Sequence, residues 1–369
     1  MGLGANGRDT RGGGMVETDG HPADTSPAAT TVTQVADVGE QALIARILGR
    51  LPVPAPDWLV VGPGDDAAVL EPARNRLEVL SCDALVEGVH FDRAFVDPGA
   101  IGHRALAVNL SDLAAMGAEP RAALLSLALP AALPLADFDA LVDGLLALAA
   151  RHRVTLVGGN ITRSPGPLIA DVTVLGSVGR RRVLRRAGAR PGDEVYLSGE
   201  IGAAAAGLES LRAGVPAEDE PDGGLAACQV RYRRPEPRVR LGLMLARNQA
   251  ATACMDLSDG LADAATQVAR ASGTGMVLDA AALPVHPAAR RWFAGRDEEP
   301  LRAAIAGGDD YELLFTVRPR FRRRFQAAYR RSGDLRVTRI GTVTADRAVV
   351  LRREDGRNEP VPAGFAHFR

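Results

Sequence analysis

Aspartates recur at turns along this sequence, in an arrangement that could hold divalent cations. Five segments carry them: VGPGDDAAVL with Asp65 and Asp66, LSCDALVEGVHF with Asp83, NLSDLAAMGAEP with Asp112, MDLSDGLADA with Asp256 and Asp259, and GGDDYELLF with Asp309 and Asp310. Each turn alone is typical of ordinary structure, because GDD and DG are common turn signals and an Asp before a helix is a common cap. Most of the five lie at expected strand ends, where sites in layered folds gather, and this favours one shared site.

Clustered carboxylates repel one another and remain ionised together only when cations are present. Their hard oxygen ligands suit Mg²⁺, which commonly bridges carboxylates and substrate phosphates. An acidic site without metal would repel a nucleotide, whereas several bound Mg²⁺ ions invert the sign of the local charge. The segments GGN (158–160) and GEIGAAAAGL (199–208) add two expected Gly-rich loops, of which the first could bring backbone close to a phosphate. The sequence therefore predicts a metal-lined phosphate site.

The basic residues exclude three kinds of chemistry. All 44 of them are arginine, and the sequence contains no lysine. P-loop nucleotide binding and protein-kinase catalysis both need a lysine at the phosphates, and Schiff-base chemistry needs an amine. Phosphate must therefore be bound by arginine, by backbone N–H groups or by metal ions.

Composition narrows the class of protein further. The 369 residues are 46% hydrophobic and 24% charged, which is ordinary for two globular domains. The net charge of −1 indicates neither a nucleic-acid partner nor a membrane surface. We find no apolar run long enough to span a membrane and no secretory signal. Three widely spaced cysteines, Cys82, Cys228 and Cys254, favour a reducing cytoplasm over a disulfide framework or zinc site.

The elements that must position the aspartates alternate between strand and helix patterns. We expect a disordered tail over 1–38, an N-terminal domain over 39–180 and a C-terminal domain over 181–369, with the boundary in the basic stretch GRRRVLRRAGARPGD. A long helix is expected from Pro98 to Met116, because its apolar positions recur at helical spacing and Gly117 follows. Strands are expected near 58–62, 76–81, 121–129, 154–157, 168–178, 194–198, 251–255 and 275–279, and a strand, a helix and a strand over 312–352. The expected class is α+β with an α/β-like alternation.

These motifs, in their order and spacing, resemble the thiamine-monophosphate kinases. The series GDDAAVL, SCDALVEGVHF, AVNLSDLAAMGAEP, VGGN, RRAGARPGD, MDLSDGLADA and AGGDDYELLF covers roughly residues 39–369. The wider superfamily also contains aminoimidazole ribonucleotide synthetase, selenophosphate synthetase and a hydrogenase-maturation protein. The resemblance implies direct, in-line phosphorylation of thiamine monophosphate to thiamine diphosphate by ATP and several Mg²⁺ ions. It also implies mixed or antiparallel sheets, a site in the cleft between the domains, and a homodimer formed through the N-terminal sheets.

The resemblance also implies site residues. The implied metal ligands are Asp66, Ser81, Cys82, Asp83, Asp112, Asn160, Asp256 and Asp259; the implied ATP contacts are Gly159, Asn160, Arg186 and Ser258; the implied contacts of thiamine monophosphate are His90, Asp309 and Phe365. Three positions depart from the family pattern. Asn160 stands where an Asp is often found, Cys82 replaces a usual Thr and could serve only through its carbonyl, and Asp309 is shorter than the usual Glu.

Other interpretations of the same residues remain open. A cyclo-ligase of the same superfamily, or a non-catalytic protein that binds Mg²⁺ and nucleotide, could use the same aspartates. A hydrogenase-maturation factor would need a reactive C-terminal cysteine, whereas this chain ends in FAHFR. Phe365 could stack on the thiazolium ring or simply fix the tail to the core, and His90 alone is more often a packed residue than a ligand. The arginine-rich run 231–240 is interpreted as a solvated or salt-bridged face. No general base is assigned, because the acceptor phosphate is already nucleophilic near neutral pH.

Overall fold

The computed structural model describes residues 32–216, 224–296 and 299–364. The chain divides into two units, 1–32 and 33–369, and the helices and strands described here all belong to the second. Most of the tail expected over 1–38 lies outside the described residues. Its last part differs from the expectation, because Val35–Val38 forms the short helix α1 and the side chain of Val35 is buried. The helix α2 follows at Glu40–Leu48.

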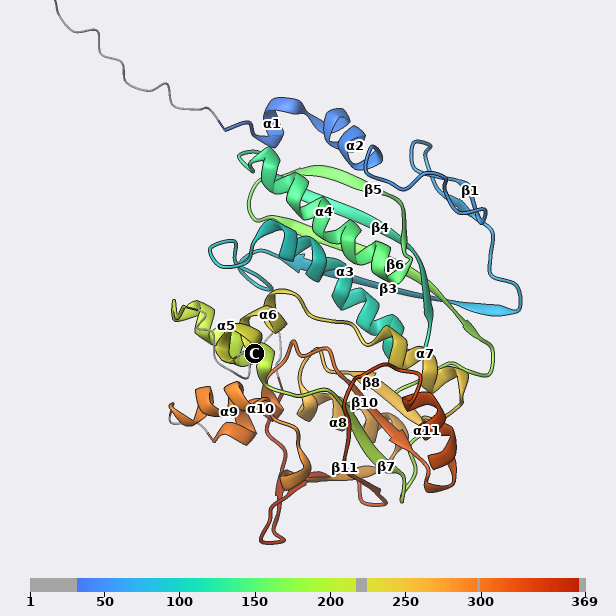
Figure 1. Cartoon of the computed structure of the whole chain (residues 1–369), viewed down its shortest axis with the longest axis vertical. Helices are drawn as coiled ribbons and strands as arrows, with labels where there is room; N and C mark the ends of the chain where they lie inside the picture. The colour runs from blue at the N-terminus through green and yellow to red at the C-terminus, as the bar shows by residue number, and fades with distance from the viewer. Residues whose placement is uncertain (1–31, 217–223, 297–298, 365–369) are drawn as a thin grey trace, which may run out of the picture. The chain divides into compact units, whose positions relative to one another are not determined.

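The first half of the unit contains a four-stranded sheet with helices packed on one face (Figure 1). Its strands are β3 Arg76–Val86, β4 Glu119–Pro130, β5 Thr155–Ser164 and β6 Ile169–Gly179, in the order β3-β6-β4-β5. The β3–β6 and β6–β4 pairs are antiparallel, whereas β4 and β5 are parallel. A separate two-stranded sheet consists of β1 Leu59–Val61 and β2 Val69–Leu70.

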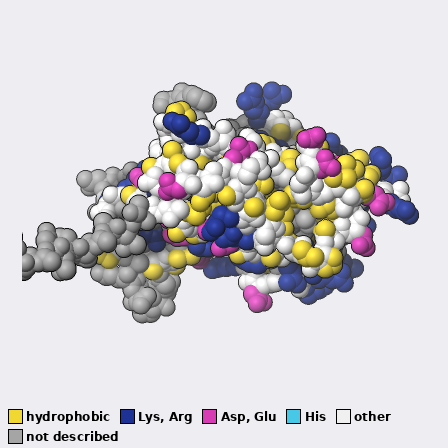
Figure 2. Space-filling view, turned by 90° about the horizontal axis from the view of Figure 1, so that it is seen from above, with side chains coloured by type: hydrophobic (Ala, Val, Ile, Leu, Met, Phe, Trp, Pro, Cys, Tyr) yellow, Lys and Arg dark blue, Asp and Glu magenta, His cyan; other side chains and the backbone are white. Residues whose placement is uncertain are grey.

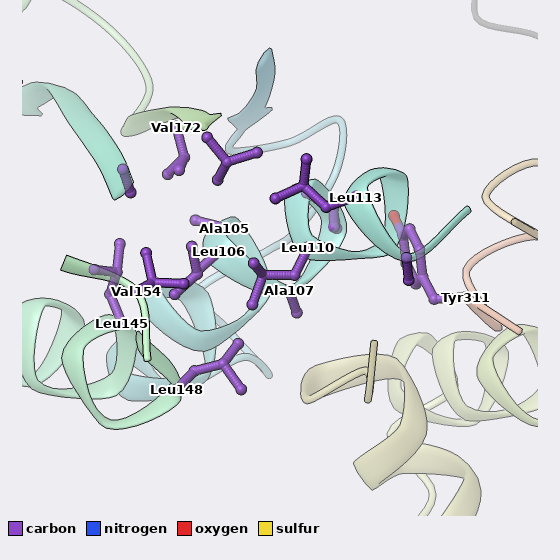
Figure 3. Packing of buried hydrophobic residues seen from close by; sticks show 14 of the residues in the cluster. Ala105, Leu106, Ala107, Leu110, Leu113, Leu145, Leu148, Val154, Val172 and Tyr311 are labelled. Atoms are coloured by element: carbon purple, nitrogen blue, oxygen red, sulfur yellow. The ribbon is translucent and has the colours of Figure 1, made fainter. Parts of the chain in front are cut away.

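The helix α3, Pro98–Ala115, is the central element of this half. Asp97 caps it by accepting a 2.8 Å hydrogen bond from the N–H of Ala100, and Pro98 begins the first turn. The helix packs against α4, Leu135–His152, so closely that a Cβ at Gly102 would lie 1.8 Å from the carbonyl oxygen of Leu141. Figure 3 shows leucines of α3 and α4 interleaved beside Val172 of the sheet. Burial on nearly all sides means that any polar residue of α3 needs a partner inside the protein.

The second half contains a seven-stranded sheet in the order β13-β12-β9-β11-β7-β10-β8. Its strands are β7 Glu194–Ser198, β8 Ala253–Asp256, β9 Gly275–Asp279, β10 Leu313–Val317, β11 Val337–Thr344, β12 Val349–Arg352 and β13 Asn358–Pro360. The β12–β9 pair is parallel, and the other pairs described in this sheet are antiparallel. The helices are α5 Ala203–Arg212, α6 Gly224–Arg233, α7 Val239–Arg247, α8 Leu261–Ser272, α9 Pro287–Ala294, α10 Pro300–Ala306 and α11 Arg322–Tyr329, with 3₁₀ turns at Ala280–Ala282 and Pro319–Phe321.

The expected α+β class with mixed and antiparallel sheets is confirmed. Two local expectations were wrong. GGN (158–160) is not a loop, because β5 continues through it to Ser164. The sequence pattern predicts one helix near 235–247, whereas in the structure α7 begins at Val239 and α6 precedes it as a separate helix. Within the described residues no helix is both long and apolar enough to cross a membrane. The domain boundaries stay predictions.

Candidate functional site

Three of the predicted aspartates meet where α3 lies between the two sheets. Asp83 comes from β3, Asp112 from the last turn of α3 and Asp256 from the end of β8. The side chains of Asp83 and Asp112 share a hydrogen bond, and the charge of Asp112 also acts on Asp256. The charge of Asp259, just after β8, reaches Asp83 as well. The convergence therefore joins residues that are far apart in the sequence.

Short polar residues hold these aspartates in place. Ser81 donates a hydrogen bond to Asp112, and Ser111 donates one of 2.6 Å to Asp256. The side-chain oxygen of Asn109 accepts a 3.1 Å hydrogen bond from the backbone N–H of Asp83. The motif NLSD thus uses its Asn and Ser to fix neighbouring strands and its Asp to face the cluster.

The electrostatics of the cluster fit a bound cation. Partial loss of water around the carboxyl group, followed by the charge of Asp112, raises the pKa of Asp83 to about 6 although Asp83 is open to solvent. Burial and then Asp112 raise the pKa of Asp256 to about 7, and Ser111 and Arg186 offset this only in part. Like charges that lack compensation are what a divalent ion would stabilise. Even so, no three Asp, Glu, His or Cys side chains in the described parts of the chain are arranged as ligands of one ion.

Two motifs, MDLSDG and GGDDYEL, lie together beside the aspartate cluster. β8 and β10 pair with Asp256 opposite Leu313, and the pairing continues into the loop after β8 and the loop before β10. The N–H of Asp309 donates a 2.7 Å hydrogen bond to the carbonyl of Ser258. A Cβ at Gly308 would lie 2.6 Å from that same carbonyl oxygen, so only glycine permits this approach. MDLSDG and GGDDYEL are therefore neighbours in space.

The four residues Asp309 to Glu312 each bind a different part of the protein. Asp309 forms a 2.6 Å ion pair with Arg104 of α3. Asp310 is buried and accepts hydrogen bonds from the N–H groups of Gly202 (2.6 Å) and Ala204 (3.1 Å) at the start of α5. Tyr311 packs beside α3 in Figure 3.

Glu312 is fully buried and is held by two arginines of the basic run. Arg231 lies 2.6 Å from Oε1, and Arg238 binds both carboxylate oxygens, with Nε 2.7 Å from Oε2. Ser198 adds a 2.5 Å hydrogen bond to Oε2. The other three arginines of this run bind the carbonyl of Phe95, Asp97 and the carbonyl of Arg331. A salt-bridged role of the basic run is confirmed for Arg231, Arg234 and Arg238.

Two further residues that were predicted for the site, His90 and Arg186, lie beside these motifs. His90 occupies the turn after β3, where its Nδ1 accepts a 3.0 Å hydrogen bond from the N–H of Val86 and its carbonyl accepts one of 3.1 Å from the hydroxyl of Tyr232. Arg186 is exposed, binds Gln267 at 2.5 Å, and acts electrostatically on Asp256.

Other predicted residues are not brought to the cluster. Asp66 lies in the exposed loop between β1 and β2, where its N–H binds Asp65 at 2.8 Å. Cys82 and Asn160 lie on the sheet face opposite Asp83, because the registers place Asn160 beside Ser126 and Asp171, and Cys82 donates to Asp171 at 3.1 Å. Gly159 adjoins Asn160 in the exposed middle of β5. Phe365 lies outside the described residues.

Sequence reasoning missed several residues at this site. Arg104, Tyr232 and Tyr311 surround Asp309, and Asp171 acts on Asp83 from the opposite face of the sheet. The partners of Arg104 come from segments 128 and 205 residues away, so no local pattern marks them. Tyr311 could have been suspected from its place inside GGDDYEL.

Comparisons with known proteins show which family the chain belongs to. Residues 64–178 match the family model of AIR synthase related protein, N-terminal domain, and residues 190–354 match the C-terminal domain. The thiamine-monophosphate kinase of Synechococcus elongatus is 38% identical over 342 residues, which cover 90% of this chain and 98% of the relative.

Solved structures show the same relationship. A crystal structure of thiamine-monophosphate kinase from Stenotrophomonas maltophilia K279a superimposes with a TM-score of 0.73 at 39% identity, covering 86% of this chain and 96% of that one. The structure of AaThiL complexed with AMPPCP and TMP gives 0.70 at 32% identity, covering 92% and 100%. Hydrogenase maturation protein HypE in complex with ATP shares the fold alone, at 19% identity, a TM-score of 0.73 and coverage of 90% and 98%. The chain therefore belongs to the AIR synthase related family and, within it, to the thiamine-monophosphate kinases.

Proposed function

We propose that this chain transfers the terminal phosphoryl group of ATP to thiamine monophosphate, forming thiamine diphosphate and ADP. The observation that carries the proposal is the convergence of Asp83, Asp112 and Asp256 beside the loop that carries Asp309. A relative at 32% identity has been obtained in complex with AMPPCP and TMP, which supports the same pair of substrates here.

We further propose that the aspartate cluster holds Mg²⁺. Asp83, Asp112 and Asp256, with Asp259 close by, supply hard oxygen ligands whose mutual repulsion a divalent ion would relieve. When bound, Mg²⁺ would neutralise the phosphates of both substrates. Asp66, Ser81, Cys82 and Asn160 remain candidate ligands on the strength of the resemblance.

The transfer needs positioning more than covalent chemistry from the protein. A phosphate oxygen of thiamine monophosphate attacks the γ-phosphorus of ATP, and the bond between that phosphorus and the β–γ bridging oxygen breaks, so ADP leaves. Such a phosphate has a second pKa of about 6 and needs no general base near neutral pH. Arg186 would contribute a fixed positive charge for phosphate, and Gly159, Asn160 and Ser258 would complete the nucleotide contacts.

The substrate pocket would contain His90 and Asp309, with Phe365 as a third contact. His90 reaches it from the turn after β3, and Asp309 from the loop before β10. The thiazolium ring of the substrate is a cation, which suits a carboxylate and an aromatic face. These assignments rest on the resemblance, on the ion pair of Asp309 with Arg104 and on the hydrogen bond from Tyr232 to the carbonyl of His90.

We propose that two copies of the chain pair through the open face of the four-stranded sheet. Leu80 of β3 is 68% exposed and Leu124 of β4 is 43% exposed, and their registers with β6 place both on the face away from α3. A sheet face with exposed leucines is typical of an interface. On the face seen from above in Figure 2, hydrophobic side chains lie between charged ones.

We also propose that the enzyme acts in the cytoplasm, where ATP is available and where its three cysteines would stay reduced. One assay tests the main proposal: purified protein with ATP, Mg²⁺ and thiamine monophosphate, with products separated by chromatography. Equal amounts of thiamine diphosphate and ADP are expected. Tight binding of ATP without any diphosphate product would contradict the proposal and favour a non-catalytic nucleotide-binding protein.

A further inference from the structure

Arg104 is a buried cation in the middle of α3, and neither the aspartate cluster nor the phosphate chemistry uses it. Its side chain is 2% exposed. Nη2 lies 2.6 Å from Oδ1 of Asp309, and Nη1 donates a 2.5 Å hydrogen bond to the carbonyl of Tyr232. The guanidinium also lies 4.7 Å from the ring centre of Tyr232 and 6.0 Å from that of Tyr311. Aromatic faces and oxygens therefore surround it.

Stability alone is a poor reason to bury this charge. Moving a guanidinium out of water costs free energy that an ion pair often fails to recover. Arg104 also leaves one donor unused, because Nε is buried and meets no hydrogen-bond partner among the described residues. Asp309 itself keeps 29% of its side chain exposed, so the pair lies at the wall of an open region. A buried cation that holds a partly exposed carboxylate favours a positioning role.

The contacts of Arg104 fix both predicted substrate residues. Asp309 has a φ of +69°, a left-handed conformation that is rare outside glycine, and so its backbone needs support. Its Oδ1 receives Arg104 and also the hydroxyl of Tyr311 at 3.2 Å, whereas no hydrogen bond within the described part of the chain engages Oδ2. Tyr232, whose carbonyl Arg104 holds, donates its hydroxyl to the carbonyl of His90.

We infer that Arg104 is a positioning residue for thiamine monophosphate: it fixes Asp309 with one carboxylate oxygen turned to the substrate and, through Tyr232, fixes the turn that carries His90. This inference rests on the proposed function and deepens it. It also explains how the shorter acid Asp309 can serve where the family has Glu, because Arg104 and Tyr311 determine where its carboxylate lies. ATP binding should depend much less on Arg104, because its side chain contacts none of the proposed ATP-binding residues Gly159, Asn160, Arg186 and Ser258.

The decisive variant is Arg104→Met, which removes the charge and keeps most of the volume. We expect the KM and the calorimetric Kd for thiamine monophosphate to rise about ten- to a hundredfold, the range for loss of a charged hydrogen bond. The kcat and the KM for ATP should change less than about threefold. Arg104→Lys should recover part of the affinity. The matched control is Arg240→Met. It removes an exposed arginine that binds the carbonyl of Arg331 and no residue of this network, so every kinetic and binding constant should stay unchanged.

One variant keeps the inference testable if Arg104→Met does not fold, and a double variant tests it further where Arg104→Met does fold. Tyr311→Phe removes only the hydroxyl bound to Asp309, and we expect a selective rise of about threefold or more in the KM for thiamine monophosphate. The double variant Asp309→Asn, Arg104→Met should raise the KM for thiamine monophosphate no more than either single change does. Both changes disrupt the same ion pair, so their effects should not multiply. The inference would be overturned if the effects of the two substitutions on KM multiplied independently. It would also be overturned if the affinities for ATP and for thiamine monophosphate fell equally. An inactive wild-type enzyme would instead refute the proposed function itself.

Discussion

The hydroxyl of Ser111 donates a 2.6 Å hydrogen bond to the carboxylate of Asp256, so α3 and the end of β8 are joined inside the protein. Both residues are buried, at 0% and 3% exposure. Ser111 precedes Asp112 in NLSD, and Asp256 opens the motif DLSDG, so two motifs far apart in sequence meet through one hydroxyl. This bond orients a carboxylate that we propose as a Mg²⁺ ligand.

Ser111→Ala should therefore weaken Mg²⁺ binding. Loss of a hydrogen bond that orients a metal ligand typically costs about 10- to 100-fold in metal affinity. We expect the Mg²⁺ concentration for half-maximal activity to rise by about that factor, while saturating Mg²⁺ recovers most of the turnover. Ser332→Ala removes a buried hydroxyl that binds the carbonyl of Tyr329, and it should leave the Mg²⁺ titration unchanged. An unchanged titration in Ser111→Ala would contradict the role of the bond.

Asp83→Asn should separate stability from activity. The raised pKa of Asp83 means that its negative charge is unfavourable in the metal-free fold, so the neutral amide should raise the Tm slightly. Turnover should fall by several orders of magnitude, because a proposed Mg²⁺ ligand is lost. Asp57→Asn, at an exposed position before β1, is the matched control and should change neither quantity. Near-normal turnover in Asp83→Asn would end the metal assignment.

Glu312→Gln should unfold more easily, with a loss of about 3–5 kcal/mol, because Arg231 and Arg238 would lose a buried countercharge. Burial opposes ionisation of Glu312, but Arg238, Arg231 and Ser198 outweigh it and lower its pKa below the ordinary value. A lowered carboxyl pKa contributes stability above the unfolded pKa, and that stability is lost as the pH falls through the folded value. We therefore expect the difference in the free energy of unfolding between wild type and variant to be largest near pH 7 and to shrink below about pH 4.5. Urea unfolding at several pH values measures this difference.

The matched control for that comparison is Glu236→Gln. Glu236 pairs with Arg151 at 2.7 Å, and both side chains are at least one-third exposed. Exposed pairs contribute about 0–1 kcal/mol, so the control should stay close to wild type at every pH. A pH-independent difference for Glu312→Gln would show that the glutamate acts by packing rather than by charge.

Leu80→Arg should yield monomers if the open sheet face forms the dimer. A charged residue in the centre of an apolar interface is buried without a partner, which opposes association strongly. Analytical ultracentrifugation of wild type and variant measures this directly. Val53→Arg, at a position 93% exposed and outside both large sheets, should leave the dimer intact. A wild-type chain that sediments as a monomer would contradict the proposed pairing.

The parts of the site that the sequence predicted are those that local motifs position. Asp112 lies in the last turn of a long helix and Asp256 at the end of a strand, as expected, whereas Asp83 lies inside β3, which continues to Val86. Asn160 could not be placed in this way, because the β4–β5 register shifts between Ala123 and Leu124. A slip of one residue moves a side chain to the other face of a sheet, so its orientation depends on tertiary pairing.

Long-range ion pairs were equally invisible in the sequence. Arg104 and Asp309 are 205 residues apart, and Glu312 binds arginines 74 and 81 residues away. GGDDYEL was interpreted as a turn with acidic residues, whereas its side chains diverge to four different partners. The packing of α3 and α6 against that loop decides which partner each acid binds.

Gly308→Ala tests whether the contact between the two loops serves substrate binding. The new methyl group would lie 2.6 Å from the carbonyl oxygen of Ser258, so GGDDYEL must move away from MDLSDG. We expect the KM for thiamine monophosphate to rise about tenfold or more, because displacements of about 1 Å at positioned groups cost up to about a hundredfold. Gly166→Ala, where the added methyl group meets no atom within 4 Å, is the matched control. If Gly308→Ala unfolds the protein, the loop contact is structural; if it folds and the KM rises, Asp309 acts from the place where Ser258 and Arg104 hold it.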